Sequence, residues 1–524
     1  MKRQIQRIFL ILTVVLLTIA LYGCTGGKEN KTTNTESLPA QGNNPSSPEP
    51  SEGGSVVVGI QQDFDSLDPH IAEAAGTSEV LFNIFEGLVK PDSEGNLVPA
   101  VASEYKIAED GKTYTFVLRE GILFHNGEPV TVEDIKYSID RSAGKLEGQT
   151  QPLVPAYSGI ESVIIVDPST IEIHLYEGDT ELIGYLTAAI IPEGYEDSAT
   201  QPVGTGPFKF VSYSPQQSLV VEANEDYWME DVPYLDKVEF RIVANTDSAM
   251  MELKAKTIDV YPYLTIDQAN ELSNEYDILI GTTNLVQALF LNNAVEPFDD
   301  VKVRQALSYI IDSQMIIDMV AGGNGTEIGS NMFPAFGKYY IEELANVYNP
   351  DIKKAKELLV EAGYADGFEM TITVPSNYQF HVDTTQVIVE QLKQVGISAK
   401  IELVEWSTWL NDVYIGRNYQ STVIGLDAEL APKALLKRYG SEAADNFVNF
   451  SNDEYDEVLE SAIASISDEE KITCYTRLQE ILVEEAASVF IQDPALLVSV
   501  NKDLKGYTFY PVYVQDMSKL YFVK

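Results

Sequence analysis

The order of elements in the second half of the chain limits the fold more than any other feature. Apolar spacing predicts a strand at 370–374, a helix over 383–395 and a second strand at 399–404. Parallel neighbouring strands need a long crossover connection, and the predicted helix supplies one. The two strands are therefore expected to pair in parallel. The second half is therefore predicted to hold a parallel α/β sheet.

Helices dominate the rest of this half. The spacing over 299–320 predicts one helix that ends at Gly322-Gly323. Asn349-Pro350 opens the next predicted helix, which Gly363 closes. We expect these elements to form one lobe, residues 286–490.

The first half is richer in strands. Alternating apolar and polar residues predict strands at 56–60, 114–118, 171–175 and 238–242. Thr131 is predicted to cap a short helix to Arg141, with Asp134 in the reciprocal capping position. We expect residues 55–285 and the returning segment 491–524 to form the other lobe. A chain that crosses twice between lobes makes a hinge with a cleft.

Charge excludes several classes of partner. The chain has 80 acidic and 35 basic residues, a formal net charge of −45. Such a surface repels phosphate backbones and anionic lipid head groups, so we expect no nucleic-acid binding. With four histidines and two cysteines, the chain is poorly equipped for a zinc site or a disulfide framework. We therefore predict no metal and no cofactor.

The N-terminus has the pattern of an export signal. Lys2, Arg3 and Arg7 precede an apolar run at 8–22, shorter than the ~20 residues that cross a bilayer. An uncleaved anchor helix is the alternative. The run ends in Leu-Tyr-Gly-Cys24, which resembles the bacterial lipobox and implies that 1–23 are removed and Cys24 is lipidated. The polar, Gly- and Ser-rich composition of 24–54 predicts a disordered tether.

Several motifs follow one another in the remaining chain. They are FDSLDP (64–69), FEGLV (85–89), LVPAVASEY (97–105), FHNGEPVT (124–131), VGTGPFKF (203–210), NEDYW (224–228) and PFDD with VRQAL (297–307). In this order they resemble the extracellular solute-binding proteins of family 5, which serve peptide and nickel ABC transporters. The resemblance covers nearly all of 55–524. It implies a two-lobe α/β clamshell of the periplasmic-binding-protein type (class II), with an extra subdomain at about 90–200 and the ligand enclosed between the lobes.

The resemblance also implies a place for a ligand's ammonium group. Peptide-binding members use an acidic residue of the second lobe, in a segment that here reads GLDAELAP (425–432). Counting from Gly425 gives this role to Glu429. Counting back from Pro432 shifts the register, so Asp427 is a second candidate. A carboxylate in a closed cleft makes strong charge-assisted hydrogen bonds to an ammonium; the alternative is a pair of solvated acids.

Other candidate ligand-binding residues are less sharply marked. Dipeptide-binding relatives place an Arg in the stretch that here reads HVDTTQ (381–386), which has none. His381, otherwise a loop histidine, or Arg417 could replace it. Trp406 is predicted either to line the pocket or to pack in the hydrophobic core. Asp65, in the first motif, is the last candidate ligand-binding residue.

No Gly-x-Ser-x-Gly or His-Glu-x-x-His motif is present, so an enzyme is not expected. We expect a monomeric, lipid-anchored ABC-importer component outside the cytoplasm, which delivers a peptide or other amine-bearing solute to permease subunits. Alternatives are a non-peptide solute, such as a metal chelate, an opine or an oligosaccharide, and a ligand-sensing accessory protein. The histidines include no pair at ligand spacing, which argues against nickel held by imidazoles.

Overall fold

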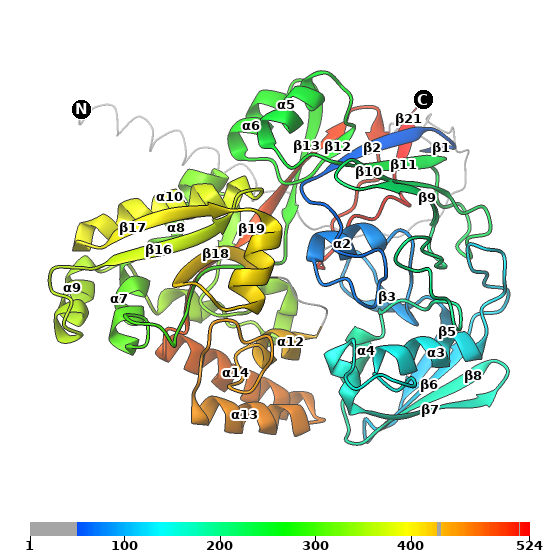
Figure 1. Cartoon of the computed structure of the whole chain (residues 1–524), viewed down its shortest axis with the longest axis horizontal. Coiled ribbons are helices and arrows are strands. Elements are labelled where there is room, and N and C mark those ends of the chain that lie inside the picture. Colours follow the sequence, from blue (N-terminus) through cyan, green and yellow to red (C-terminus); the bar gives the residue numbers. More distant parts are fainter. Residues whose placement is uncertain (1–49, 427–430, 513, 524) are drawn as a thin grey trace, which may run out of the picture. The chain divides into compact units, whose positions relative to one another are not determined.

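A computed structural model describes residues 50–426, 431–512 and 514–523 (Figure 1). The predicted signal peptide, Cys24 and most of the tether lie outside the described residues, as do Asp427 and Glu429. Within the described ranges, no helix has the length and apolar character needed to cross a membrane.

One mixed sheet joins strands from both halves of the chain. Its order is β17-β16-β18-β14-β19-β12-β2-β11-β10-β9, and β13 and β15 also pair with β19. These strands are β2 (Ser55–Ile60), β9 (Phe208–Ser214), β10 (Ser218–Ala223), β11 (Lys237–Ile242), β12 (Val260–Tyr261), β13 (Tyr276–Thr282), β14 (Val286–Leu291), β15 (Gly325–Glu327), β16 (Glu369–Pro375), β17 (Ser398–Val404), β18 (Ser421–Leu426) and β19 (Ser488–Asn501). We call the β2 side the first lobe and the β14 side the second lobe.

Strand β19 passes from the second lobe into the first. Near its start Ser488 lies opposite Phe290 of β14, and near its end Val500 lies opposite Val260 of β12. Beside it, the chain crosses between the lobes at 283–285. Asp493 joins the two crossings, because its Oδ1 accepts the Leu285 N–H at 3.1 Å and the Thr283 hydroxyl at 3.3 Å.

The second lobe confirms the predicted parallel unit. Strands β16 and β17 are parallel neighbours, and α10 (Gln379–Leu392) lies between them in the chain. The other helices are α7 (Val301–Ile310), α8 (Ser313–Ala321), α9 (Ile352–Glu361), α11 (Trp406–Thr408), α12 (Pro432–Lys437), α13 (Asp453–Ala464) and α14 (Asp468–Glu484).

The single helix predicted over 299–320 is wrong. Ile311 has an extended backbone, and the Asp312 side chain accepts the N–H of Met315 at 2.8 Å. Asp312 therefore caps a new helix, and the segment becomes α7 and α8. The predicted end is confirmed, since Gly322 takes the left-handed conformation that closes α8.

The first lobe carries a separate four-stranded antiparallel sheet with the order β5-β6-β8-β7. Its strands are β5 (Ala102–Ile107), β6 (Thr113–Leu118), β7 (Ile160–Asp167) and β8 (Thr170–Leu175). Helix α3 (Val132–Ser142) has the predicted capping box of Thr131 and Asp134. The sheet and helix share a hydrophobic core with one another that includes Phe116, Ile135 and Ile173. Helices α2 (Ala75–Leu81), α4 (Leu182–Tyr185), α5 (Thr246–Lys254) and α6 (Ile266–Leu272) complete this half of the chain.

Candidate ligand-binding site

A pocket opens between the two lobes. Its empty space is about 750 Å³, including the solvent at its mouth. Among the described lining residues, the first lobe contributes the short segment 73–75, Leu285 belongs to the crossing between the lobes, and the others come from the second lobe. The lining residues are Glu73, Ala74, Ala75, Leu285, Tyr378, His381, Trp406, Trp409, Leu410, Tyr414, Ile424, Gly425, Leu426 and Arg438.

Aromatic rings form the main wall of this pocket. The rings of Trp406 and Trp409 stack at 5.3 Å, and Tyr378 meets Trp406 edge-on at 5.5 Å. Trp409 is buried and donates its indole N–H to the Thr422 hydroxyl at 3.0 Å, whereas Trp406 is half-buried. Such rings offer a large contact area with few geometric demands on the ligand.

His381 lies on helix α10, so its interpretation as a loop histidine is wrong. The helix starts at Gln379 without a side-chain cap, so the sequence carries no start signal there. The buried ring accepts the Gln287 amide N–H at 2.8 Å through Nδ1. Burial lowers the pKa of His381 to about 3. The ring is therefore neutral and supplies no charge for a ligand carboxylate.

Two other predicted residues, Gly425 and Asp65, lie at the pocket wall and behind it. Gly425 lines the pocket, where a Cβ would come within 3.1 Å of the Leu285 side chain. Asp65 is not a lining residue, but its Oδ2 accepts the N–H groups of Glu73 at 2.7 Å and Ala74 at 3.1 Å. It therefore holds the first-lobe wall in place.

Arg417 precedes β18, whereas the pocket lies at the far end of that strand. Its guanidinium donates to Asn449 Oδ1 at 3.0 Å and to the Ala444 carbonyl at 2.8 Å. The structure thus brings together Trp406, His381 and Gly425, places Asp65 behind the wall, and leaves Arg417 outside the lining.

Sequence reasoning missed Arg438 and Tyr378. Arg438 lines the pocket just after α12, and its Nε lies 3.6 Å from Asp445 Oδ2. Pro432 in the first turn of α12 was the available signal, because proline there marks the start of the helix that Arg438 follows. The Tyr378 hydroxyl donates to Gln62 Oε1 of the first lobe at 2.6 Å, a contact that no local pattern announces.

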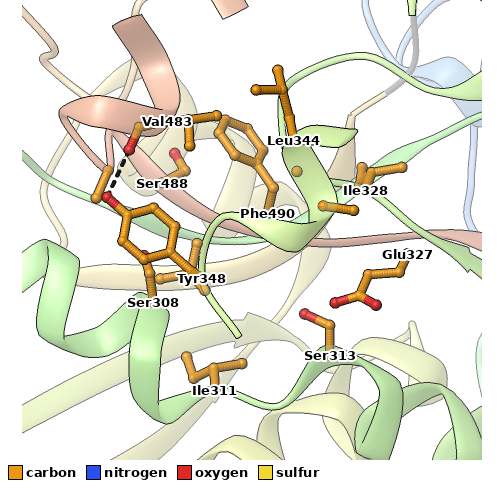
Figure 2. A pocket seen from close by; sticks show the side chains of 14 residues that line it. Ser308, Ile311, Ser313, Glu327, Ile328, Leu344, Tyr348, Val483, Ser488 and Phe490 are labelled. Carbon is orange, nitrogen blue, oxygen red and sulfur yellow. Dashed lines mark hydrogen bonds between the residues drawn. The ribbon is translucent and has the colours of Figure 1, made fainter. Parts of the chain in front are cut away.

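A second cavity lies inside the second lobe (Figure 2) and has about 400 Å³ of empty space. Its lining includes Ser308, Ser313, Glu327 and Tyr348, and Tyr348 donates to the Val483 carbonyl at 2.8 Å. None of the predicted site residues that the structure describes lines it. Because only one lobe forms it, lobe closure would not enclose a ligand there.

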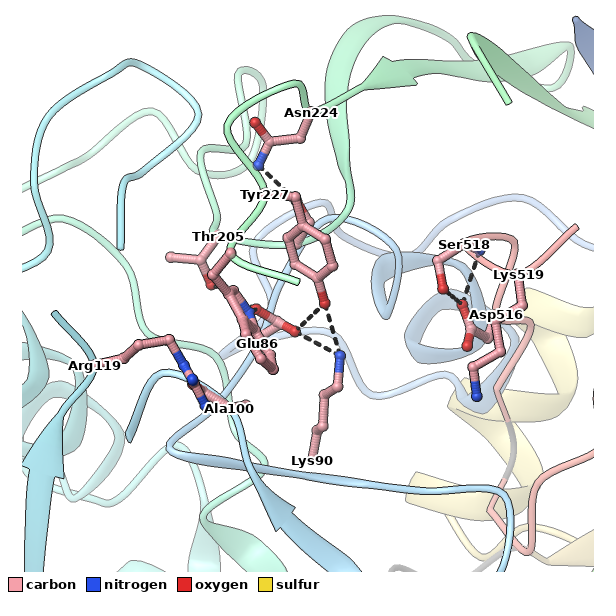
Figure 3. Close-up of polar contacts among 12 residues, drawn as sticks. Glu86, Lys90, Ala100, Arg119, Thr205, Asn224, Tyr227, Asp516, Ser518 and Lys519 are labelled. Carbon is pink, nitrogen blue, oxygen red and sulfur yellow. Dashed lines mark hydrogen bonds and ion pairs between the residues drawn. The ribbon is translucent and has the colours of Figure 1, made fainter. Parts of the chain in front are cut away.

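A buried polar cluster explains two of the sequence motifs (Figure 3). Glu86 accepts from Lys90 at 2.8 Å, from the Tyr227 hydroxyl at 2.7 Å and from the Trp228 indole at 2.8 Å. Arg119 lies 3.8 Å over the Trp228 ring. The cluster is internally satisfied and joins segments of the first lobe, so these motif residues are structural. Within the described residues, no group of three or more His, Cys, Asp and Glu could hold a metal ion.

Comparison with known proteins agrees with this geometry. The glutathione-binding protein GsiB of Salmonella typhi is 28% identical over 482 residues, which is 87% of this chain and 92% of the relative. The periplasmic binding protein DppA of Helicobacter pylori, solved with the peptide STSA, is 26% identical with a TM-score of 0.81 over 90% of this chain and 99% of that one. The binding protein AgaA of A. tumefaciens R10, solved with agropinic acid, is 25% identical with a TM-score of 0.80, again over 90% and 99%.

These likenesses confirm the predicted two-lobe binding-protein fold and place the chain among binding proteins rather than enzymes. Residues 96–446 match the family described as bacterial extracellular solute-binding proteins, family 5 middle. The chain therefore belongs to the bacterial extracellular solute-binding proteins of family 5.

Proposed function

We propose that this chain is the lipid-anchored receptor of an ABC importer and captures peptides or a related amine-bearing solute. The observation that carries the proposal is the aromatic pocket that both lobes line. Aromatic walls accept side chains of varied shape, which suits a peptide receptor. Two of the named relatives point the same way, since one is glutathione-binding and the other was solved with a peptide. The agropinic acid bound by AgaA keeps a non-peptide solute as the alternative.

Charged groups would fix the two ends of such a ligand. We propose Glu429 or Asp427 as the partner of the ammonium, because both follow the lining residue Leu426 within three positions of the sequence. Arg438 is the only Lys or Arg among the described lining residues, and we propose it as the partner of the ligand carboxylate. The neutral ring of His381 then serves as a wall rather than as a charge.

The lobe boundaries, the anchor and the delivery step belong to the same proposal. We propose the division into 55–285 with 491–524 and 286–490. The packing supports it from Leu496 onward, since Leu496, Val498 and Met517 share a core with Val56, whereas Ile491 still packs with Val489 in the second lobe. Cys24 would hold the receptor, a monomer, at the outer face of the membrane, where it meets permease subunits. A Cys24→Ala variant is expected to leave the membrane fraction, and retention there would contradict the anchor.

Native mass spectrometry tests the ligand class. The mature chain, carrying Cys24→Ser, is weighed as purified and again after gentle unfolding. A co-purified peptide mixture is the expected result and gives the length preference directly. Glu429→Gln or Asp427→Asn should weaken the rebinding of those peptides. An empty protein that shows no thermal shift with mixed di- to hexapeptides would contradict a peptide ligand.

A further inference from the structure

The lobes also meet outside the pocket, between the loop 178–181 of the first lobe and helices of the second. On α14, the Lys471 ammonium donates to Glu181 Oε1 at 2.9 Å and to the Thr180 hydroxyl at 2.7 Å. One turn along the same helix, the Tyr475 hydroxyl donates to the same Glu181 oxygen at 2.6 Å. Glu181 is thus held by two groups from the other lobe.

A second lysine completes this contact. The Lys433 ammonium, in the first turn of α12, pairs with Asp179, and the Lys433 backbone N–H donates to Glu181 Oε2 at 3.3 Å. Burial alone would raise the pKa of Asp179, but the charge and hydrogen bond of Lys433, the Glu181 N–H and the Lys471 charge together outweigh it and hold that pKa below its usual value. We call Asp179, Thr180 and Glu181 with their three partners the lysine contact.

Both lysines of this contact are almost completely buried. The side chains of Lys433 and Lys471 are 5% and 4% exposed. A buried ammonium is tolerated only when it is paired, because its desolvation is expensive. If the lobes separated, all of these pairs would break and the groups would return to water. The lysine contact therefore exists only while the lobes are together.

The first-lobe side of the contact is already rigid. The Asp179 N–H donates to the Gly111 carbonyl at 3.1 Å, and the Glu181 N–H donates to Asp179 Oδ1 at 2.9 Å. A Cβ at Gly178 would lie 2.2 Å from the Asp110 carbonyl oxygen, so the loop packs directly on the adjoining turn. The loop backbone and the Asp179 carboxylate are thus held by bonds within the first lobe, which reduces the entropy that closure would cost.

We propose that the lysine contact sets the open–closed equilibrium of the receptor and so regulates ligand affinity without touching the ligand. This inference rests on the proposed function, capture of a solute between the lobes. None of the six residues lines the pocket. A ligand that binds only the closed form has an apparent Kd equal to its intrinsic Kd divided by the closed fraction. Weakening the contact therefore weakens binding of every ligand by the same factor.

The test compares Glu181→Gln with the matched control Glu177→Gln, which removes the same charge from an exposed residue of the same segment. Small-angle scattering of the ligand-free mature chain measures closure, and calorimetry with the peptide Ser-Thr-Ser-Ala and with glutathione measures affinity. Glu181→Gln should enlarge the radius of gyration and weaken binding of either probe by about tenfold or more. The control should change neither quantity. If Glu181→Gln does not fold, Asp179→Asn replaces it.

A double variant separates this role from a merely structural one. Glu181→Gln with Lys471→Met removes the unpaired ammonium, so the radius of gyration and the affinity should move back towards the wild-type values. An unchanged radius in Glu181→Gln, or an equal change in the control, would overturn the proposal. If wild-type protein binds neither probe, the scattering result alone decides the role of the lysine contact, and the ligand class is decided separately by the mass spectrometry described above.

Discussion

The pocket and the lysine contact join the same two lobes with opposite chemistry. Around the pocket, Glu73, Ala74 and Ala75 of the first lobe face aromatic rings of the second, and a hydrogen bond from Tyr378 to Gln62 crosses between the lobes. The lysine contact is instead built from buried ion pairs with fixed partners. Aromatic surfaces tolerate varied ligands, whereas buried ion pairs demand one geometry. Substitutions in the pocket should therefore change ligand selectivity, whereas substitutions in the lysine contact should change the free energy of lobe closure.

The half-buried carboxylate of Asp179 and the buried carboxylate of Asp493 show the same contrast. Asp179 faces an ammonium and its pKa is lowered, whereas burial raises the pKa of Asp493, at the crossing between the lobes, to about 7. Within the described chain, Asp493 has hydrogen-bond donors but no ion pair with Lys or Arg. The Asp493 carboxylate at the crossing thus has no ion-pair partner among the described residues, whereas the Asp179 carboxylate in the lysine contact is paired with the Lys433 ammonium.

The largest expected effect is that of replacing Asp493. The pKa of Asp493 is raised from 3.8 in the unfolded chain, so its contribution to stability is fully present below pH 3.8 and is lost as the pH rises through 7. Three pKa units correspond to about 4 kcal/mol. Asp493→Asn should therefore match wild type near pH 4 and exceed its free energy of unfolding by up to that amount at pH 8. Urea unfolding across this range measures the difference, and a difference independent of pH would contradict the assignment.

Substitution of Trp409 tests whether this pocket-lining residue also contributes to the hydrophobic core of the second lobe. It packs in the second-lobe core with Phe447 and Tyr455, and it also lines the pocket. Trp409→Ala should lower the free energy of unfolding by about 3 kcal/mol, at the lower end for such truncations because the open pocket side lets neighbours move in. Thermal unfolding without ligand gives the value. A loss below about 1 kcal/mol would mean that the ring does not support the core.

Trp406→Ala should separate binding from stability. Trp406 is half-buried and stacks on Trp409, so its loss removes contact area for the ligand but little core. We expect about tenfold weaker binding of the co-purified peptides, which corresponds to the stacking and contact energy of one ring. The unfolding midpoint without ligand serves as the control and should change much less than in Trp409→Ala. Equal affinity in the variant and wild type would exclude Trp406 from the ligand surface.

The fold could be predicted where apolar periodicity or a capping motif within a short segment determines the element. The parallel pair β16–β17 and the capping box of Thr131 and Asp134 follow from spacing within about thirty residues. The break between α7 and α8 did not, because the apolar spacing runs through Asp312 and hides its role as a cap. His381 was misplaced for the opposite reason, since α10 begins without any capping residue.

The site was less predictable because its parts are distant in sequence. Trp406 and Gly425 were found through a family resemblance, not through any pattern of their own. Asp179 and Lys433 are 254 positions apart, and each alone reads as a solvated charge in an acidic chain. Only the packing of the loop 178–181 against α12 and α14 brings them together, and no local propensity encodes that packing.

The smallest expected effect concerns the hydrogen bond from Tyr378 to Gln62, which crosses between the lobes beside the pocket. Tyr378→Phe removes the hydroxyl that donates to Gln62 but keeps the ring against Trp406. A neutral hydrogen bond contributes about 1 kcal/mol, so binding of the co-purified peptides should weaken roughly fivefold. Glu181→Gln should weaken it more, because it also leaves a buried ammonium unpaired. Calorimetry on both variants measures which substitution weakens peptide binding more. If Tyr378→Phe had the larger effect, the pocket side rather than the lysine contact would hold the lobes together.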